Sequence, residues 1–162
     1  MKVVSNSSPL IALSSIGRLE LVHRRFPEGI LIPRAVGREV VETGHGKAGA
    51  QRVSESKWIE VCDCKAGRVL DLLRLELDEG ESEAIVLSLE TEAPMILLDE
   101  KSARQVARRM RLSMLGTVGL LIWAKQQQEI PLLKPELDLL MSMGKFRIGA
   151  DVYQFALQVV GE

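Results

Sequence analysis

Aromatic residues make up only 4% of this 162-residue sequence, and it contains just two cysteines and two histidines. A core built with so few aromatic side chains must be mostly aliphatic. No apolar run approaches the ~18 residues that a membrane-spanning helix needs; the richest candidate is Val118 to Ala124. Asn6 and Pro9 interrupt any apolar segment of a signal peptide. We therefore expect a globular protein of the cytoplasm.

Several common kinds of site are missing from the sequence. No Gly-x-Gly-x-x-Gly or P-loop pattern occurs. Neither His23 nor His45 lies near a recognisable nucleophile motif, so we interpret both as surface residues. Cys62 and Cys64 form a Cys-x-Cys pair that no further cysteine supports, and we interpret them as ordinary thiols. The net charge of −1 excludes a general basic coat but permits a local basic face.

Short apolar segments alternate with helical ones along the chain. The apolar runs predict strands over residues 2–5, 30–32, 58–62, 95–98 and 112–115. Helices are expected between them, over 10–16, 19–26, 35–42, 50–56, 67–77, from 81, 102–110 and 117–127, with two more after Pro131 and Gly149. Residues 43–49, with three glycines, are expected to form a mobile loop. This alternation predicts one α/β domain over residues 1–162, with a parallel sheet between helices.

The stretch from Gly80 to Arg104 is the one around which the chain is organised. Glu81 begins an apolar helix, and the short strand that follows Pro94 ends on Asp99. A helix with a basic face begins directly afterwards. Active sites of open α/β sheets lie at helix starts and at the carboxyl ends of strands.

Two further residues upstream have the same kind of position. Asn6 follows the first strand, and Glu39 lies in the first turns of the helix after the second strand. Clustered carboxylates repel one another unless a cation neutralises them. Oxygen ligands are those that Mg²⁺ or Mn²⁺ prefers. The spacing is equally explained by acids that favour helix starts on a solvated surface.

The helix after Asp99 carries a basic stripe. Arg104, Arg108 and Arg111 recur at i, i+4 and i+7, and Lys101 precedes them by about one turn. Such a stripe can hold the phosphates beside a scissile bond. A plain solvated helix face has the same pattern. The apolar helix from Val118 to Ala124 is interpreted as buried or as facing a second copy of the chain.

Five segments in order resemble the PIN-domain family, in its prokaryotic subgroup related to VapC toxins. They are Val-Val-Ser-Asn-Ser-Ser-Pro-Leu-Ile-Ala-Leu from Val3, Ile-Pro-Arg-Ala-Val-Gly-Arg-Glu-Val from Ile32, Gly-Glu-Ser-Glu-Ala-Ile from Gly80, Leu-Leu-Asp-Glu-Lys-Ser-Ala-Arg from Leu97, and Gly-Thr-Val-Gly-Leu-Leu from Gly116. The resemblance covers nearly the whole chain. It implies a three-layer α/β/α sandwich around a parallel sheet, and metal-dependent hydrolysis of RNA with Mg²⁺ or Mn²⁺.

The resemblance also implies a set of site residues. The four metal-binding and catalytic positions of the family fall on Asn6, Glu39, Glu81 and Asp99. Glu83 competes with Glu81 for the third position but would point away from it on a helix, and Asp99 is preferred to Glu100 because it directly ends the apolar run. Thr117 resembles a small hydroxyl residue that orders water or substrate, and Arg104 and Arg108 would steady the RNA.

The first position departs from the family pattern, because Asn6 stands where an aspartate is usual. An amide oxygen still ligates a metal, but the site has one negative charge fewer. Two interpretations follow: a ribonuclease, as the toxin of a toxin–antitoxin pair, or a degenerate PIN domain that binds RNA or protein without cleavage. A phosphotransfer protein is a third class, against which Asn6 argues. An antitoxin partner and a homodimer are expected possibilities.

Overall fold

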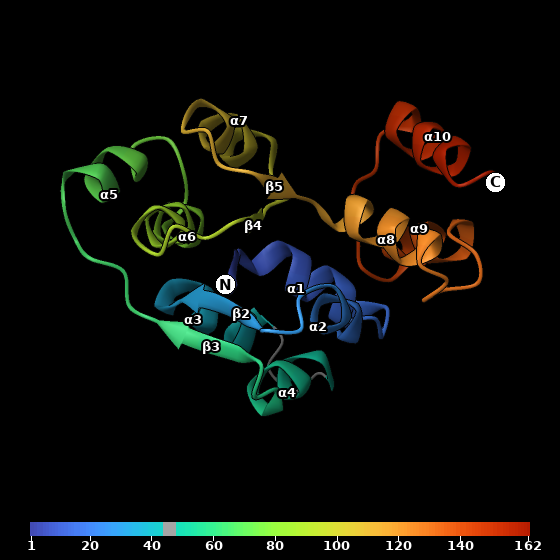
Figure 1. Ribbon diagram of the computed structural model, residues 1–162, viewed down its shortest axis with the longest axis horizontal. Helices are drawn as coiled ribbons and strands as arrows, with labels where there is room; N and C mark the ends of the chain where they lie inside the picture. The colour runs from blue at the N-terminus through green and yellow to red at the C-terminus, as the bar shows by residue number, and fades with distance from the viewer. Residues whose placement is uncertain (44–47) are drawn as a thin grey trace.

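A five-stranded parallel sheet forms the centre of the computed structural model, which describes residues 1–43 and 48–162 (Figure 1). The strand order is β3-β2-β1-β4-β5, and every neighbouring pair is parallel. The strands are β1 (Val3–Ser5), β2 (Ile30–Pro33), β3 (Ile59–Cys62), β4 (Ile96–Leu97) and β5 (Met114–Leu115). All five were predicted from the apolar runs.

Helices connect and cover these strands. They are α1 (Ser7–Ser15), α2 (Glu20–Arg25), α3 (Arg34–Thr43), α4 (Ala48–Glu55), α5 (Arg68–Leu73), α6 (Glu79–Glu90), α7 (Lys101–Arg109), α8 (Thr117–Gln126), α9 (Lys134–Ser142) and α10 (Ala150–Val159). Each corresponds to a predicted helix. The helix expected over 67–77 is shorter, because α5 ends at Leu73 and hydrogen-bonded turns continue to Leu77. None of the helices in the described part of the chain is long and apolar enough to cross a membrane.

Two aliphatic cores lie on opposite faces of the sheet. Successive strand residues alternate between them: Val3 and Leu97 belong to one core, and Val4 and Ile96 to the other, as the pleat of a strand requires. The first core is completed by α1, α2, α3, α4, α8, α9 and α10, and the second by α5, α6 and α7. In Figure 1 the latter three helices lie together on one side of β1 and β4. The predicted three-layer α/β/α sandwich is confirmed.

The connections bring the candidate residues to one edge of the sheet. From β1 the chain moves outward to β2 and β3, and it then crosses back to β4 and β5 on the other side of β1. Neighbouring strands β1 and β4 therefore lead away in different directions at their carboxyl ends. Such a switch point opens a crevice at the end of an α/β sheet. Asn6 directly follows the last residue of β1, and Asp99 lies two residues beyond β4.

The structure differs from the predictions in the segment after α3 and at the end of α7. Thr43 ends α3, and Ala48 and Gly49 begin α4, so these residues are not loop as expected; the rest of that predicted loop, with His45, lies outside the described residues. Arg111 does not share the basic face of α7. That helix ends at Arg109, and Arg111 has a left-handed backbone with φ of 60°.

Candidate active site

Asn6 is a buried polar side chain at the end of the central strand. Its backbone N–H donates to the Leu97 carbonyl at 3.0 Å, which continues the pairing of β1 with β4. Only 3% of the residue is exposed, and its side-chain Oδ1 accepts no hydrogen bond from any residue that the structure describes. Buried polar atoms are nearly always paired, so an unpaired amide oxygen marks a place for a further donor or a cation.

Glu39 reaches the same place from α3. A Cβ atom added to Gly80 would lie 2.5 Å from Glu39 Oε1 and 3.4 Å from Asn6 Oδ1, so both oxygens lie against the backbone of Gly80. The Ser7 hydroxyl donates to the other oxygen of Glu39. Gly80 and Ser7 are part of this arrangement and were not assigned a role from the sequence. The signal for Gly80 is a glycine within the first turn of a helix, where the missing side chain leaves room for Glu39.

Helix α6 begins at Glu79, two residues before the predicted start, and Glu81 lies in its first turn, where it pairs with the N-cap residue Asp78. Its backbone N–H donates to Asp78 Oδ1 at 2.8 Å, and its carboxylate accepts the Asp78 N–H at 3.2 Å. This reciprocal pair is a capping box. Burial raises the pKa of Glu81, and the charges of Asp78, Glu100 and Glu39 raise this pKa further. The carboxylate therefore lies within electrostatic reach of Glu39 while one of its oxygens caps the helix.

Glu83 faces a different neighbourhood. Its Oε1 accepts from the Cys64 thiol at 3.9 Å, and its buried Oε2 has no partner within the described ranges. Burial raises the pKa of Cys64 to about 11, helped by the charges of Glu83 and Glu90. Such a thiol stays protonated and unreactive at neutral pH. Cys62 and Cys64 are both free, consistent with ordinary thiols.

Asp99 is held firmly at the end of β4. The backbone N–H of Thr117 donates to Oδ1 at 2.7 Å, and the Thr117 hydroxyl donates to Oδ2 at 2.7 Å. The Ser8 hydroxyl adds a bond of 3.2 Å to Oδ2. Burial raises the pKa of Asp99, and the bonds from Thr117 and Ser8 and the charge of Arg104 partly oppose this rise. Thr117 itself is fully buried, so its contact with Asp99 is the contribution it makes to the site.

The carboxyl edge thus contains two neighbouring groups, linked by the consecutive residues Asn6, Ser7 and Ser8. One group joins Asn6 to Glu39 beside Gly80, and the other joins Asp99 to Thr117. No three His, Cys, Asp or Glu side chains come close enough to share a metal ion in residues 1–43 and 48–162. Glu81 is turned towards its cap and Asp99 towards Thr117. The four-residue metal site stays a prediction.

The donor set nevertheless fits a hard divalent cation. The oxygen of Asn6 has no partner among the described residues, and it lies beside a carboxylate oxygen of Glu39. Oxygen ligands of this kind suit Mg²⁺ or Mn²⁺. A cation here would also relieve the mutual repulsion that contributes to the raised pKa of Glu81.

The predicted basic residues divide into two kinds. Arg104 donates from Nη1 to the Leu98 carbonyl at 2.8 Å, and the same atom would lie 3.2 Å from a Cβ added to Gly116, beside Asp99. Arg108 is exposed on α7, and no described side chain pairs with it. Sequence reasoning missed Lys145 and Arg147, which line a pocket with Ser8 and Asp99. The signal was present as alternating basic and apolar residues in Lys-Phe-Arg-Ile.

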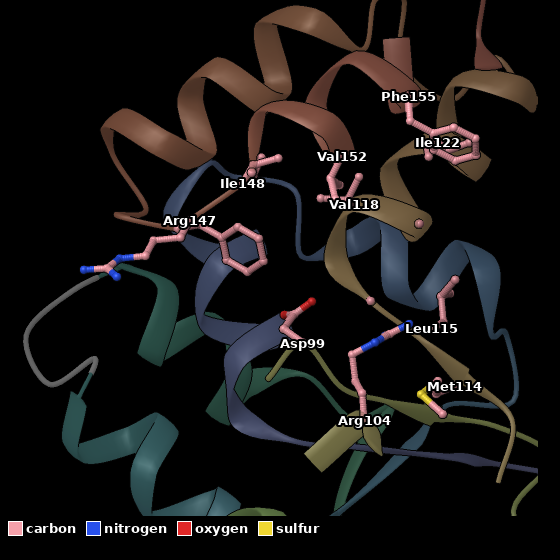
Figure 2. A pocket seen from close by; sticks show the side chains of 14 residues that line it. Asp99, Arg104, Met114, Leu115, Val118, Ile122, Arg147, Ile148, Val152 and Phe155 are labelled. Atoms are coloured by element: carbon pink, nitrogen blue, oxygen red, sulfur yellow. The ribbon is translucent and has the colours of Figure 1, made fainter. Parts of the chain in front are cut away.

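Two hollows meet at Asp99. One, of about 450 Å³, lies between Ser7, Ser8 and the segment with Lys145. The other, of about 510 Å³, extends from Asp99 and Arg104 along α8 to Phe155 of α10 (Figure 2). Asp99 is therefore reachable from both sides.

The sheet order and the polar carboxyl edge define an α/β domain whose candidate site lies at the switch point between β1 and β4. A family model, DUF3368, described as a PIN domain, matches residues 2–162, and the chain belongs to this family. The resemblance to PIN domains is thereby confirmed. PIN domains are generally metal-dependent nucleases. No curated protein and no solved structure matches the chain with significance.

Proposed function

We propose that this protein is a divalent-metal-dependent endoribonuclease and the toxin of a toxin–antitoxin pair. The observation that carries the proposal is the buried Asn6 oxygen, which has no partner among the described residues and lies beside Glu39, near the fixed carboxylate of Asp99. Membership of the PIN-domain family supports nuclease-type chemistry. The RNA substrate and the toxin role are extended from the resemblance to the VapC-related subgroup.

In the proposed reaction this chain supplies ligands and orientation. Asn6 and Glu39 would hold an Mg²⁺ or Mn²⁺ ion, with Glu81 and Asp99 adding negative charge. When bound, such an ion polarises a phosphodiester and lowers the pKa of an attacking water. Thr117 holds Asp99 in place through two hydrogen bonds. Arg104, beside Asp99, and Arg108, further along α7, would steady the phosphates of the RNA.

The direct test is cleavage of RNA by the purified protein against added Mg²⁺ or Mn²⁺. Cleavage should require the ion, and Asp99→Asn should lower it by about 10- to 100-fold, as the loss of a group that supports the metal ligands does. Arg68→Gln, on the exposed surface of α5, is the matched control and should cleave like the wild type. Cleavage that survives Asp99→Asn would mean a contaminant or a site elsewhere.

A second candidate function is that of a degenerate PIN domain that binds RNA or protein without cutting. The neutral Asn6 and the lack of three converging acids among the described residues favour it. Metal titration separates the two candidates. Binding that is weak in the wild type and unchanged by Asn6→Asp would favour the non-catalytic function.

The proposal includes a protein partner, an antitoxin, and leaves a homodimer as the other candidate for the same surface. Val69, Leu72 and Leu75 of α5 and its following turn are 46%, 65% and 82% exposed, an apolar face suited to a protein contact. Helix α8 serves less well, because Leu120, Leu121 and Ala124 are buried in the core. The mass of the purified protein in solution distinguishes monomer from dimer.

A further inference from the structure

Strand β3 lies at the outer edge of the sheet, and no described strand pairs with its outer side (Figure 1). On its inner side the Ile30 N–H donates to the Trp58 carbonyl at 2.8 Å. Backbone groups of successive strand residues point alternately to the two sides, so those of Glu60 also point towards β2. The backbone groups of Ile59 and Val61 therefore point outwards, where another strand can pair with them.

This edge is apolar and has little protection. Natural proteins protect the edges of sheets with proline, bulges, charged side chains or a covering element. Strand β3 contains no proline, and Val61 is 51% exposed. Next to it lies a hollow of about 480 Å³ between β3, α3 and α4, whose mostly apolar lining includes Val41, Val53 and Ile59. An apolar edge beside an apolar hollow is typical of a surface that contacts another protein.

The sequence of β3 and its flanks is complementary to a second copy of itself that runs antiparallel. A two-fold axis at Glu60 brings Ile59 of one copy opposite Val61 of the other. The same axis brings Lys57, before the strand, opposite Asp63, after it. Each of these pairs occurs twice by symmetry. Apolar side chains thus face apolar ones and opposite charges face each other, as in the cross-strand pairs that stabilise a sheet.

The charges also distinguish this register from its neighbour. The two Glu60 side chains meet at the axis, and Lys2 of each copy binds its own Glu60 at 2.6 Å, which offsets their repulsion. An axis at Val61 is the next register in which outward-pointing residues meet. It would place Lys57 opposite Lys65, and like charges directly opposite each other destabilise a sheet. The axis at Glu60 is therefore favoured.

We propose that two copies of this chain form a dimer through β3, which joins their sheets into one. The Val61 N–H of each copy donates to the Ile59 carbonyl of the other, while the Ile59 N–H already donates to Ser56 at 3.1 Å. A two-fold axis perpendicular to the sheet places α3 and α4 of both copies on the same face, so the two hollows meet and are covered. The inference does not rest on the proposed nuclease function, and it leaves the α5 face to a different protein. An extended segment of another protein is the competing occupant of the edge.

Sedimentation equilibrium of the purified protein, up to about 100 μM, measures the dissociation constant of the dimer. Val61→Lys places a charge on the edge and should weaken the dimer about tenfold. Val69→Lys, the same change at a valine of α5 that is 46% exposed, is the matched control and should dimerise like the wild type. Val61→Pro removes the donated N–H, which an edge strand tolerates, and should weaken the dimer likewise. Thermal unfolding checks that each variant is folded.

The ion pair is tested by a double-mutant cycle. Lys57→Gln should raise the dissociation constant about threefold, for two exposed ion pairs, and should have no effect once Asp63 is changed to Asn. Asp63 also binds Arg34 of its own copy, and the cycle cancels that contact. An equal effect of Lys57→Gln in both backgrounds would overturn the antiparallel pairing. A monomeric wild type at these concentrations, or a dimer lost in Val69→Lys and kept in Val61→Lys, would overturn the dimer through β3.

Discussion

The Asp99 carboxylate and the Asn6 amide follow neighbouring strands, but the protein treats them differently. Asp99 accepts three hydrogen bonds, two from Thr117 and one from Ser8. Asn6 Oδ1 is buried and accepts none from the described residues, and its near neighbour is the carboxylate of Glu39. The Asp99 half of the edge, formed by Asp99, Thr117 and Ser8, is therefore complete: the protein alone supplies its hydrogen bonds. The Asn6 half has an unused acceptor beside a negative charge, which a cation would complete.

The largest effect is expected from Asn6→Asp, which adds a charge to the incomplete half. A second carboxylate beside Glu39, at a position only 3% exposed, should destabilise the metal-free protein by about 3 kcal/mol. Added Mn²⁺ should recover most of this loss, because the cation neutralises both acids. The free energy of unfolding in urea, determined with and without Mn²⁺, measures both the loss of stability and its recovery.

The wild type in both buffers is the control for this experiment. An equal loss of stability with and without Mn²⁺ would show that Asn6 and Glu39 are not metal ligands. The contrast between the two halves would then have to be explained by packing alone.

A smaller effect is expected in the complete half from Thr117→Val. Valine keeps the shape of threonine but leaves Asp99 Oδ2 without the hydroxyl donor, which should cost about 2 kcal/mol, as for hydrogen bonds to charged groups. Thr117→Ser keeps the donor and is the matched control. Chemical unfolding at neutral pH in the absence of metal gives the difference. Equal stability of the valine and serine variants would disprove the idea that Thr117 stabilises this carboxylate.

The smallest effect concerns Glu81, whose carboxylate lies within electrostatic reach of Glu39. Its pKa is raised above the ordinary 4.5 by burial, so the folded protein holds this proton more tightly than the unfolded chain does. The associated stability is present below that ordinary value and is lost as the pH rises through the folded pKa. Glu81→Gln does not ionise and still caps Asp78. The variant should therefore lose less stability than the wild type between acid and neutral pH.

Thermal unfolding of wild type and Glu81→Gln across this pH range makes the comparison. Glu79→Gln is a suitable control. Arg74 lowers the pKa of Glu79, whereas the pKa of Glu81 is raised, so the pH dependence of stability that Glu79→Gln removes should have the opposite sign. A pH-independent difference between wild type and Glu81→Gln would argue that Glu81 is not buried in its charged form.

The fold was largely predictable because its signals are local. Each strand is an apolar run bounded by turn residues, and each helix has its own start and stop residues, so element type could be inferred segment by segment. The helix α7 ends at Arg109, one residue before the predicted end, and Arg111, which was counted on its basic face, lies beyond it. The periodicity of side chains alone does not show where a helix ends and the backbone adopts a left-handed conformation.

The candidate site was predicted as residue types and only in part as geometry. Asn6 and Asp99 follow from strand ends, and Thr117 from the resemblance to PIN domains. The contact of Gly80 with Glu39, the capping role of Glu81 and the lining of one hollow by both Arg147 and Asp99 were not foreseen. Each depends on how separate segments approach one another in space.

The sequence by itself determined a parallel α/β sandwich with Asn6 and Asp99 at one edge, because alternating apolar runs and helix signals specify strand direction and order of connection. Only the tertiary structure decided which polar atoms at that edge are satisfied. Whether a buried oxygen is hydrogen-bonded depends on differences of a few tenths of an ångström in the distances between residues that are far apart in the chain. That is why Asp99 is complete and Asn6 remains open.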